Sequence, residues 1–234
     1  MLIEALSDAI TEGDNHTFIN LYSYLVLRKQ TKLSASMDNI LVDGQLMVVV
    51  LRLLGLKKLS RKSFDMTSLA PVVFLDAIEN GKTIYFVGST QLQLMSSVKK
   101  ITDNFPGLNV VRFRNGYFSG AEWKEEMALV SRLNPDIVVA GLGTPLQEQF
   151  LIDLRSSGWK GTGFTCGGFF HQTAAGINYY PVWMDKLNLR WLYRIYDEPK
   201  LAKRYFLQYP LALMLVVWDF KIKSRFTALK SKVS

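Results

Sequence analysis

Short apolar runs alternate with longer amphipathic segments along most of this chain. Strands buried on both faces of a parallel sheet read as continuous apolar runs, and the segments between them form crossover helices. The pattern therefore predicts an α/β fold with a Rossmann-like, mostly parallel sheet flanked by helices. The six expected strands cover residues 17–21, 39–42, 83–87, 109–113, 136–140 and 161–166.

Amphipathic segments of helical length fill the intervals between these strands. Two of them carry start signals, because Ser119 precedes Glu122, and Thr144 precedes Gln147, at the spacing of a capping box. Pro145 would then occupy the first helical position, where its missing N–H costs nothing. Three further helices are expected at residues 45–54, 67–80 and 91–105.

The alternation stops near residues 180–189, where the sequence becomes aromatic and basic. We therefore expect an α/β domain over residues 1–185 and a helical appendage over residues 186–234. The apolar run at residues 205–220 has about 16 residues, fewer than the roughly 20 of a spanning helix, and Pro210 interrupts it. A membrane-associating helix at the lipid surface is expected, and the alternative is a basic helix pair packed on the domain or on another subunit.

The net charge of +8 is concentrated in the same appendage. Between residues 190 and 234, ten Lys and Arg face three acidic residues, so this stretch carries +7 of the total. Interleaved Trp and Tyr favour an anionic membrane surface, and not nucleic acid, as the partner. Cys166 is the only cysteine and the sequence shows no secretory leader pattern, so we expect no internal disulfide and a cytoplasmic, peripheral location at the inner face of the cell membrane.

Ligands of open parallel sheets bind beyond the carboxyl ends of the strands, so polar residues that follow the apolar runs are the candidates for chemistry. Asp43 and Gly44 directly follow one expected strand and precede a helix. A carboxylate in this place suits a general base, and it equally suits the N-cap of the next helix.

Glycine-rich turns follow two later strands. The turn from Gly141 to Glu148 presents backbone N–H groups that could hold a phosphate or a sugar hydroxyl. It is close to a dinucleotide fingerprint, but Leu146 replaces the third glycine and the turn comes late in the chain, so no nicotinamide cofactor is expected. The other turn contains Gly168 and leads to His171, which could be an acid, a base or a diphosphate ligand, or have a structural role.

We expect cationic side chains, and not a metal ion, to neutralise the charge of a bound diphosphate. The sequence contains no Asp-x-Asp pair, and its two histidines are far apart, so we expect no metal site and no cofactor. A diphosphate would then be neutralised by arginine and lysine. The candidates are Arg61, Arg194, Lys200 and Arg204. Residues 116–118 could stack on a base or a sugar, or form a packed loop.

Taken in order, these motifs resemble the WecB/TagA/CpsF family, glycosyltransferase family 26, over about residues 17–204. The markers are Asp43-Gly44, Arg52-Leu-Leu-Gly55, Tyr85-Phe-Val-Gly88, Gly116-Tyr-Phe118, Gly141 to Glu148, Gly167-Gly-x-Phe170, Leu187 to Arg194 and Glu198-Pro199. The resemblance implies an inverting, metal-independent hexosyltransferase without a cofactor. Such an enzyme moves a sugar from a UDP-sugar to an undecaprenyl-diphosphate-linked saccharide in capsule, exopolysaccharide or cell-wall polymer synthesis, often as a homo-oligomer.

The resemblance also implies roles for individual residues. Asp43 matches the catalytic base, which deprotonates the acceptor hydroxyl. Arg194, Lys200 and Arg204 match the cationic group of an appendage that closes over the site and neutralises the departing diphosphate. The substrate-binding residues it implies, together with those proposed from the turns, are Asn20, Arg61, Gly141, Thr144, Gln147, Gly168 and His171.

The chain departs from the family pattern at His171, where an aspartate is usual, at Lys200, where an arginine is frequent, and at residues 61–65, which lack a glycine. One alternative function is a non-catalytic membrane scaffold of polysaccharide assembly, which would bind no UDP-sugar. Another is nucleic-acid binding, which would depend steeply on salt. The donor stays open among N-acetylmannosamine, its uronic acid, glucose and galactose.

Overall fold

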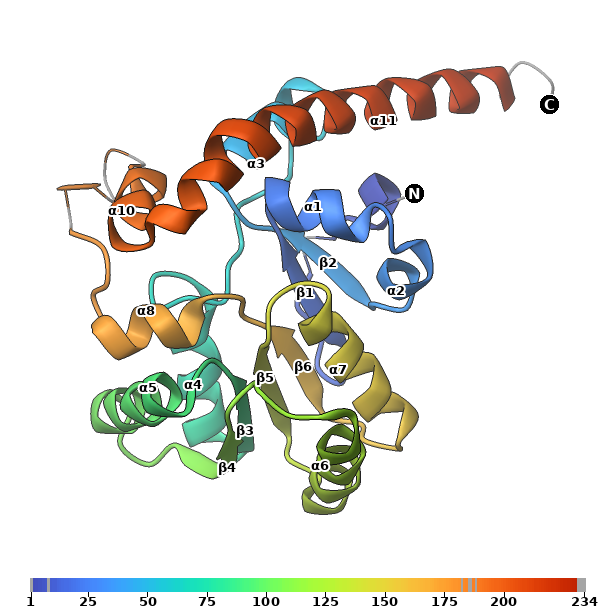
Figure 1. Ribbon diagram of the computed structural model, residues 1–234. Helices are drawn as coiled ribbons and strands as arrows, with labels where there is room; N and C mark the ends of the chain where they lie inside the picture. The colour runs from blue at the N-terminus through green and yellow to red at the C-terminus, as the bar shows by residue number, and fades with distance from the viewer. Residues whose placement is uncertain (1, 8, 182, 185–186, 188, 231–234) are drawn as a thin grey trace.

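The computed structural model describes residues 2–7, 9–181, 183–184, 187 and 189–230, and it contains a six-stranded, all-parallel sheet (Figure 1). The strands lie in the order β2-β1-β6-β5-β3-β4. All six expected strands are confirmed, although the first begins and ends two residues earlier than expected. Their bounds are β1 (Asn15–Ile19), β2 (Asn39–Val42), β3 (Thr83–Gly88), β4 (Asn109–Arg114), β5 (Ile137–Gly141) and β6 (Thr162–Thr165).

Helices cover both faces of the sheet and bury one apolar layer on each (Figure 1). A short 3₁₀ helix, η1 (Leu2–Ala5), packs at the first of these layers. The first face carries α1 (Leu21–Leu27), α2 (Thr31–Ala35), α3 (Gln45–Leu53), α6 (Gly120–Leu133) and α7 (Leu146–Ser156). The second carries α4 (Leu69–Glu79), α5 (Gln91–Asn104) and α8 (Phe169–Ala175). This arrangement confirms the predicted α/β class.

The start signals were correct for α6 and wrong for α7. Ser119 and Glu122 form the expected reciprocal capping box. Thr144 does not cap α7, because its hydroxyl accepts a hydrogen bond from the Gln147 side chain instead of a backbone N–H, and the helix begins at Leu146. Helix α1 was not expected at all.

Between residues 189 and 230, the continuously described part of the appendage, the chain forms four consecutive helical segments. They are α10 (Arg190–Asp197), the 3₁₀ helix η2 (Pro199–Leu201), the π-helical turn η3 (Arg204–Gln208) and α11 (Tyr209–Lys230). The expected boundary at residues 185–186 lies outside the described residues. The chain stays helical past Pro210, which comes just after the π-helical turn η3, so the α-helical pattern is interrupted only locally, at η3. Within the described residues, no helix combines the length and apolar character needed to cross a membrane.

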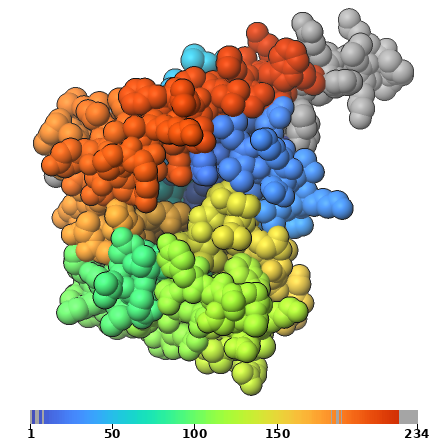
Figure 2. All heavy atoms as spheres, in the orientation of Figure 1, coloured from blue at the N-terminus to red at the C-terminus, as the bar shows by residue number. Residues whose placement is uncertain are grey.

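Helix α11 is fastened to the domain along α1 (Figures 1 and 2). Its inner side chains Ala212 and Val216 are fully buried in the first apolar layer. Next to them, Asp219 accepts hydrogen bonds from the Tyr24 hydroxyl at 2.5 Å and from Arg28 at 2.6 and 2.7 Å. Apolar packing and the hydrogen bonds of Asp219 with Tyr24 and Arg28, which we call the Asp219 clamp, therefore hold the appendage on the domain.

Candidate active site

Because every strand is parallel, all six carboxyl ends meet at one edge of the sheet, and Asn20 and Asp43 are neighbours there. Ile19 pairs with Val42 across β1 and β2, and the Asp43 N–H donates to the Ile19 carbonyl at 2.8 Å. The side chain of Asn20 caps α1 by accepting from the backbone of the next turn. Asn20 thus borders the Asp43 turn while its amide oxygen is engaged in the helix cap.

Asp43 forms the centre of a mixed-charge cluster. An Nη atom of Arg61 lies 3.2 Å from Asp43 and 2.8 Å from Asp65, and 29% of the Asp43 side chain remains exposed. Burial raises the pKa of Asp43, and the Arg61 charge only partly opposes this. Burial also pushes the pKa of Asp65 upward, but Arg61 and hydrogen bonds from Thr67 outweigh it, so that the pKa falls below its ordinary value.

Two carboxylates whose pKa values are displaced in opposite directions take different roles. Asp43 is the more basic of the two, and part of its side chain is open to solvent. Asp65 stays ionised and holds Arg61. The interpretation of Asp43 as a simple N-cap is wrong, because Gly44 is the N-cap of α3 and no side chain caps that helix.

The appendage folds back over this cluster. Arg190 of α10 lies 3.4 Å from Asp65 and donates to the Thr67 hydroxyl at 2.9 Å. After burial, the charge of Asp43 is among the influences that raise the pKa of Tyr209, which places the start of α11 within electrostatic reach of Asp43. Arg190 and the start of α11 therefore lie close to the cluster that contains the expected base.

The turn after β5 is braced from within. Gln147 is only 3% exposed. Its amide nitrogen donates to Thr144 and Glu148, and its oxygen accepts from the N–H of Gly167 at 3.1 Å. Gln147 thus ties the turn after β5 to the turn after β6. Glu148 is fully buried beside it, and burial raises its pKa.

Glycines at this edge permit close approach of the backbone. A Cβ atom on Gly141 would lie 2.9 Å from the sulfur of Cys166, and one on Gly88 would lie 2.6 Å from the carbonyl carbon of Gly141. Gly143 has a φ of +77° and open space around its Cα. The expected residues Gly141, Thr144 and Gln147 are therefore grouped in one turn, of which the part around Gly143 is open.

His171 connects α8 to the appendage. Its Nδ1 lies 2.9 Å from the Gln93 amide nitrogen, and its Nε2 lies 3.0 Å from Asp197 and 3.6 Å from Glu198. Among the described residues, this His-Asp-Glu group has donor atoms placed closely enough for a metal ion. Arg194 and Lys200 already neutralise Glu198, at 2.5 and 3.2 Å, so the group is also complete as an ion-pair cluster. Sequence reasoning missed it because His171 and Asp197 are 26 residues apart.

The three cations expected in the appendage have different environments. Arg194 approaches the turn after β6, since its guanidinium would lie 3.1 Å from a Cβ on Gly168. Arg204 stacks over the ring of Tyr22, 3.7 Å from its centre, at the start of α1. The side chain of Lys200 is 79% exposed. Arg194 and Arg204 are therefore at the strand edge in this conformation, and Lys200 is largely in solvent.

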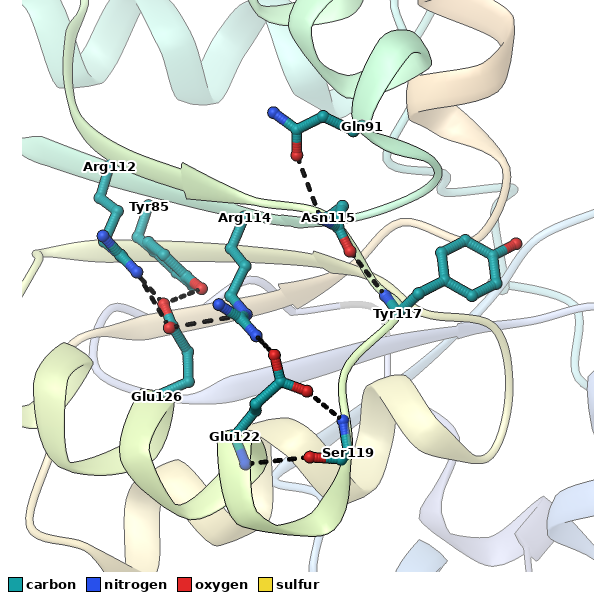
Figure 3. A network of polar contacts seen from close by, with 9 residues as sticks. All are labelled: Tyr85, Gln91, Arg112, Arg114, Asn115, Tyr117, Ser119, Glu122 and Glu126. Atoms are coloured by element: carbon teal, nitrogen blue, oxygen red, sulfur yellow. Dashed lines mark hydrogen bonds and ion pairs between the residues drawn. The ribbon is translucent and has the colours of Figure 1, made fainter.

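The edge strand β4 is held in place by the buried carboxylate of Glu126 (Figure 3). Glu126 accepts from the Tyr85 hydroxyl at 2.8 Å and from Arg112 at 2.9 and 3.0 Å. Burial pushes the pKa of Glu126 up, but these donors outweigh it and hold the pKa below its ordinary range. Asn115 then accepts from the N–H of Tyr117, whose ring points away from the network and is 75% exposed (Figure 3). The network thus fixes the base of a loop that offers an aromatic ring at the carboxyl edge.

Fold and site together define an α/β enzyme with a candidate base and a cationic cover at the carboxyl edge of its sheet. Comparison with known proteins gives the family. Residues 1–226 match the family described as "Glycosyl transferase WecG/TagA/CpsF family", and the chain belongs to it. The protein is thus a glycosyltransferase.

Two relatives illustrate the chemistry of this family. Over 83% of its length, the chain is 37% identical to UDP-Gal:alpha-D-GlcNAc-diphosphoundecaprenol beta-1,4-galactosyltransferase of Shigella boydii, and the match covers 81% of that protein. Over 62% of its length, it is 30% identical to N-acetylglucosaminyldiphosphoundecaprenol N-acetyl-beta-D-mannosaminyltransferase of Bacillus subtilis (strain 168), and the match covers 56% of that protein.

Proposed function

We propose that this chain transfers a hexose or N-acetylhexosamine from a UDP-sugar to N-acetylglucosamine linked to undecaprenyl diphosphate, as a step in bacterial capsule, exopolysaccharide or cell-wall polymer synthesis. Both relatives are named for an N-acetylglucosaminyl-diphosphoundecaprenol acceptor and for a β-linked product. The observation that carries the proposal is a carboxylate of raised pKa at a strand end, covered by a cationic appendage.

In the proposed reaction, Asp43 accepts the proton of the acceptor hydroxyl as the oxygen attacks the anomeric carbon. The new C–O bond forms while the bond from that carbon to the phosphate oxygen breaks, and UDP leaves with the electron pair. Because the sugar of UDP-galactose is α-linked, a β product requires inversion by a single in-line displacement. Arg61 orients the Asp43 carboxylate, which is 3.2 Å away.

For the donor we propose the crevice between the ends of β3 and β5. The chain leaves β3 toward α5 on one face of the sheet and leaves β5 toward α7 on the other, and nucleotides bind at such switch points. Gly143, Gly168 and Tyr117 border this edge. Arg194 and Arg204, with Lys200 after a side-chain movement, would neutralise the departing UDP without a metal.

The outer face of α11 supports peripheral docking on a membrane. Leu211, Met214 and Trp218 of α11, together with Leu207 of the preceding η3, recur at helical spacing and are all exposed. Since the opposite side of the helix is packed on the domain, this stripe faces away from the core. We propose that it lies at the acyl boundary of the inner face of the cell membrane, with the lysines and arginines of the appendage at the headgroups.

The decisive assay uses a short-chain N-acetylglucosaminyl diphosphate lipid and UDP-galactose, followed by UDP-N-acetylmannosamine, UDP-glucose and the uronic acid donor, with products read by mass spectrometry. Asp43→Asn should lower kcat by roughly 10²- to 10⁴-fold. Asp103→Asn, at an exposed surface ion pair, is the matched control and should leave activity unchanged. Full activity of the Asp43 variant would remove this residue from the mechanism.

Two further arms test the metal-free reaction and the scaffold alternative. Turnover should be unaffected by a chelator, and loss of activity that divalent metal restores would assign the His171 group to an ion. Calorimetry should detect binding of a UDP-sugar. If no donor binds, the membrane scaffold becomes the better account.

A further inference from the structure

Helix α3 carries a second exposed apolar stripe. Leu46, Val49 and Leu53 recur at positions i, i+3 and i+7 and are exposed, with Leu53 at 83%. The opposite side of the same helix is fully buried, with Met47, Val48 and Leu51 in the first apolar layer. The stripe is therefore not part of the domain core.

The segment that carries this stripe is basic. Residues 45–62 contain no acidic residue and five cations, of which Lys57 and Lys58 are exposed directly after α3. Lysine is depleted from protein–protein interfaces, whereas a basic border beside an apolar stripe is typical of helices that lie in an anionic bilayer surface. Helix α4 offers a contrast, because its exposed Val72 and Leu75 stand next to the exposed acids Asp76 and Glu79.

Helices α3 and α11 lie at the same end of the molecule. Buried residues of both belong to one apolar layer, and α3 lies behind α11 at the upper end of the molecule as drawn in Figure 1. Asp43 stands immediately before α3. Leu53 follows it by ten residues, or about 15 Å of helix, so the candidate base lies close to the stripe.

We propose that the exposed face of α3 is a second membrane-contacting surface, which together with the α11 stripe seats the protein on an anionic bilayer with Asp43 near headgroup depth. The inference rests on the proposed function and deepens it. An acceptor diphosphate and its first sugar stand at headgroup depth, so a base at the end of an interfacial helix can reach the sugar while the isoprenoid chain stays in the membrane.

The test measures binding of the full chain to phosphatidylglycerol-rich vesicles by co-sedimentation. The double variant Val49→Glu/Leu53→Glu should bind roughly tenfold more weakly, because two exposed apolar side chains leave the acyl boundary and two negative charges enter it. Val72→Glu/Leu75→Glu is the matched control on α4 and should bind like the unmodified chain. Both variants should keep turnover of a water-soluble short-chain acceptor, which excludes misfolding.

A direct measure of contact avoids relying on charge reversal. Leu53→Cys and Val72→Cys can each be labelled with an environment-sensitive dye, because burial raises the pKa of the one native thiol, Cys166, and slows its reaction. On vesicles, the dye at position 53 should shift to the blue and the dye at position 72 should not.

Two results would overturn the inference. The first is a dye at position 53 that does not shift on vesicles, although Met214→Glu/Trp218→Glu on α11 abolishes vesicle binding. The docking element would then be α11 alone, and the proposed function would stay intact. The second is a change from dimer to monomer in the α3 variant with unchanged vesicle binding, which would assign the stripe to a second copy of the chain. Absence of turnover with every donor, while the dye still shifts, would count against the transferase proposal alone.

Discussion

Replacing Asp219 with asparagine should loosen the C-terminal helix from the domain. Its carboxylate is buried and receives both donors of the Arg28 fork together with the Tyr24 hydroxyl. Asparagine keeps the shape and one acceptor oxygen, but it turns an NH₂ group toward a guanidinium that also only donates. The change therefore removes charge-assisted hydrogen bonds without creating a cavity.

The magnitude follows from the exposure of the two partners. A hydrogen bond to a charged group contributes roughly 1.5–3 kcal/mol, but 35% of the Arg28 side chain is exposed, so water screens part of the interaction. We expect a net loss of about 2 kcal/mol. For a chain of this size, that loss lowers Tm by about 4–8 °C. Hydrogen exchange should increase first along α11 and the facing turns of α1.

The pH dependence provides an independent check. The Arg28 hydrogen bond is the largest influence on Asp219 and holds its pKa below the ordinary value. A depressed folded-state pKa stabilises the protein above the unfolded-state pKa of about 3.9, and this stability is lost as the pH falls through the folded-state pKa. The stability difference between the two proteins should therefore be constant from pH 7 to about pH 5 and shrink below pH 4.

The surface pair of Asp103 with Lys99 provides the control, because exposed ion pairs contribute less than about 1 kcal/mol. Asp103→Asn should leave both Tm and exchange of α11 unchanged. If Asp219→Asn changes Tm no more than this control does, the clamp does not hold the appendage and the reasoning fails.

Three further predictions follow from the candidate site. Because burial raises the pKa of Asp43, kcat/KM should fall with unit slope as the pH drops through a value above the ordinary ~4, and a limb at or below that value would contradict the assignment. Glu126→Gln should cost roughly 2 kcal/mol in urea unfolding, while its exposed neighbour variant Glu125→Gln should cost nothing measurable. Gly88→Ala, which forces a Cβ against backbone, should destabilise by at least ~3 kcal/mol, against about 1–2 kcal/mol for Gly143→Ala, where only the positive φ is strained.

The sheet could be predicted because its signal is local. Each strand is an apolar run bounded by turn residues, and parallel pairing places all the carboxyl ends at one edge whatever the strand order. That inference placed Asp43 at this edge, where the structure also has Asn20, a residue that came only from the family resemblance. Helix α1 was missed because the expected strand ran two residues too far, to Leu21, and nothing was assigned to the residues after it, although Asn20 and Ser23 already have the spacing of the capping box that starts the helix.

The polar partners of the site could not be predicted, since they join residues far apart in the sequence. The capping signal at Thr144 was misinterpreted because Gln147 is drawn toward Gly167, twenty residues later. The contact between His171 and Asp197 similarly depends on how the appendage returns to the sheet. No local pattern of residue types encodes that return.

The inner and outer sides of the appendage differ in their side chains and in their contacts. Its inner side chains include Arg190 and Arg204, which contact Thr67 and Tyr22 at the edge of the sheet. Its outer side carries the apolar residues of α11. A helix with apolar side chains on both its buried and its exposed face shows a weak apolar periodicity, so its sequence looks like a nearly continuous apolar run with scattered charges. This explains why the segment suggests a membrane span that is too short. We therefore expect that detaching α11 impairs both the proposed membrane docking and the placement of the neighbouring Arg204 at the proposed active site.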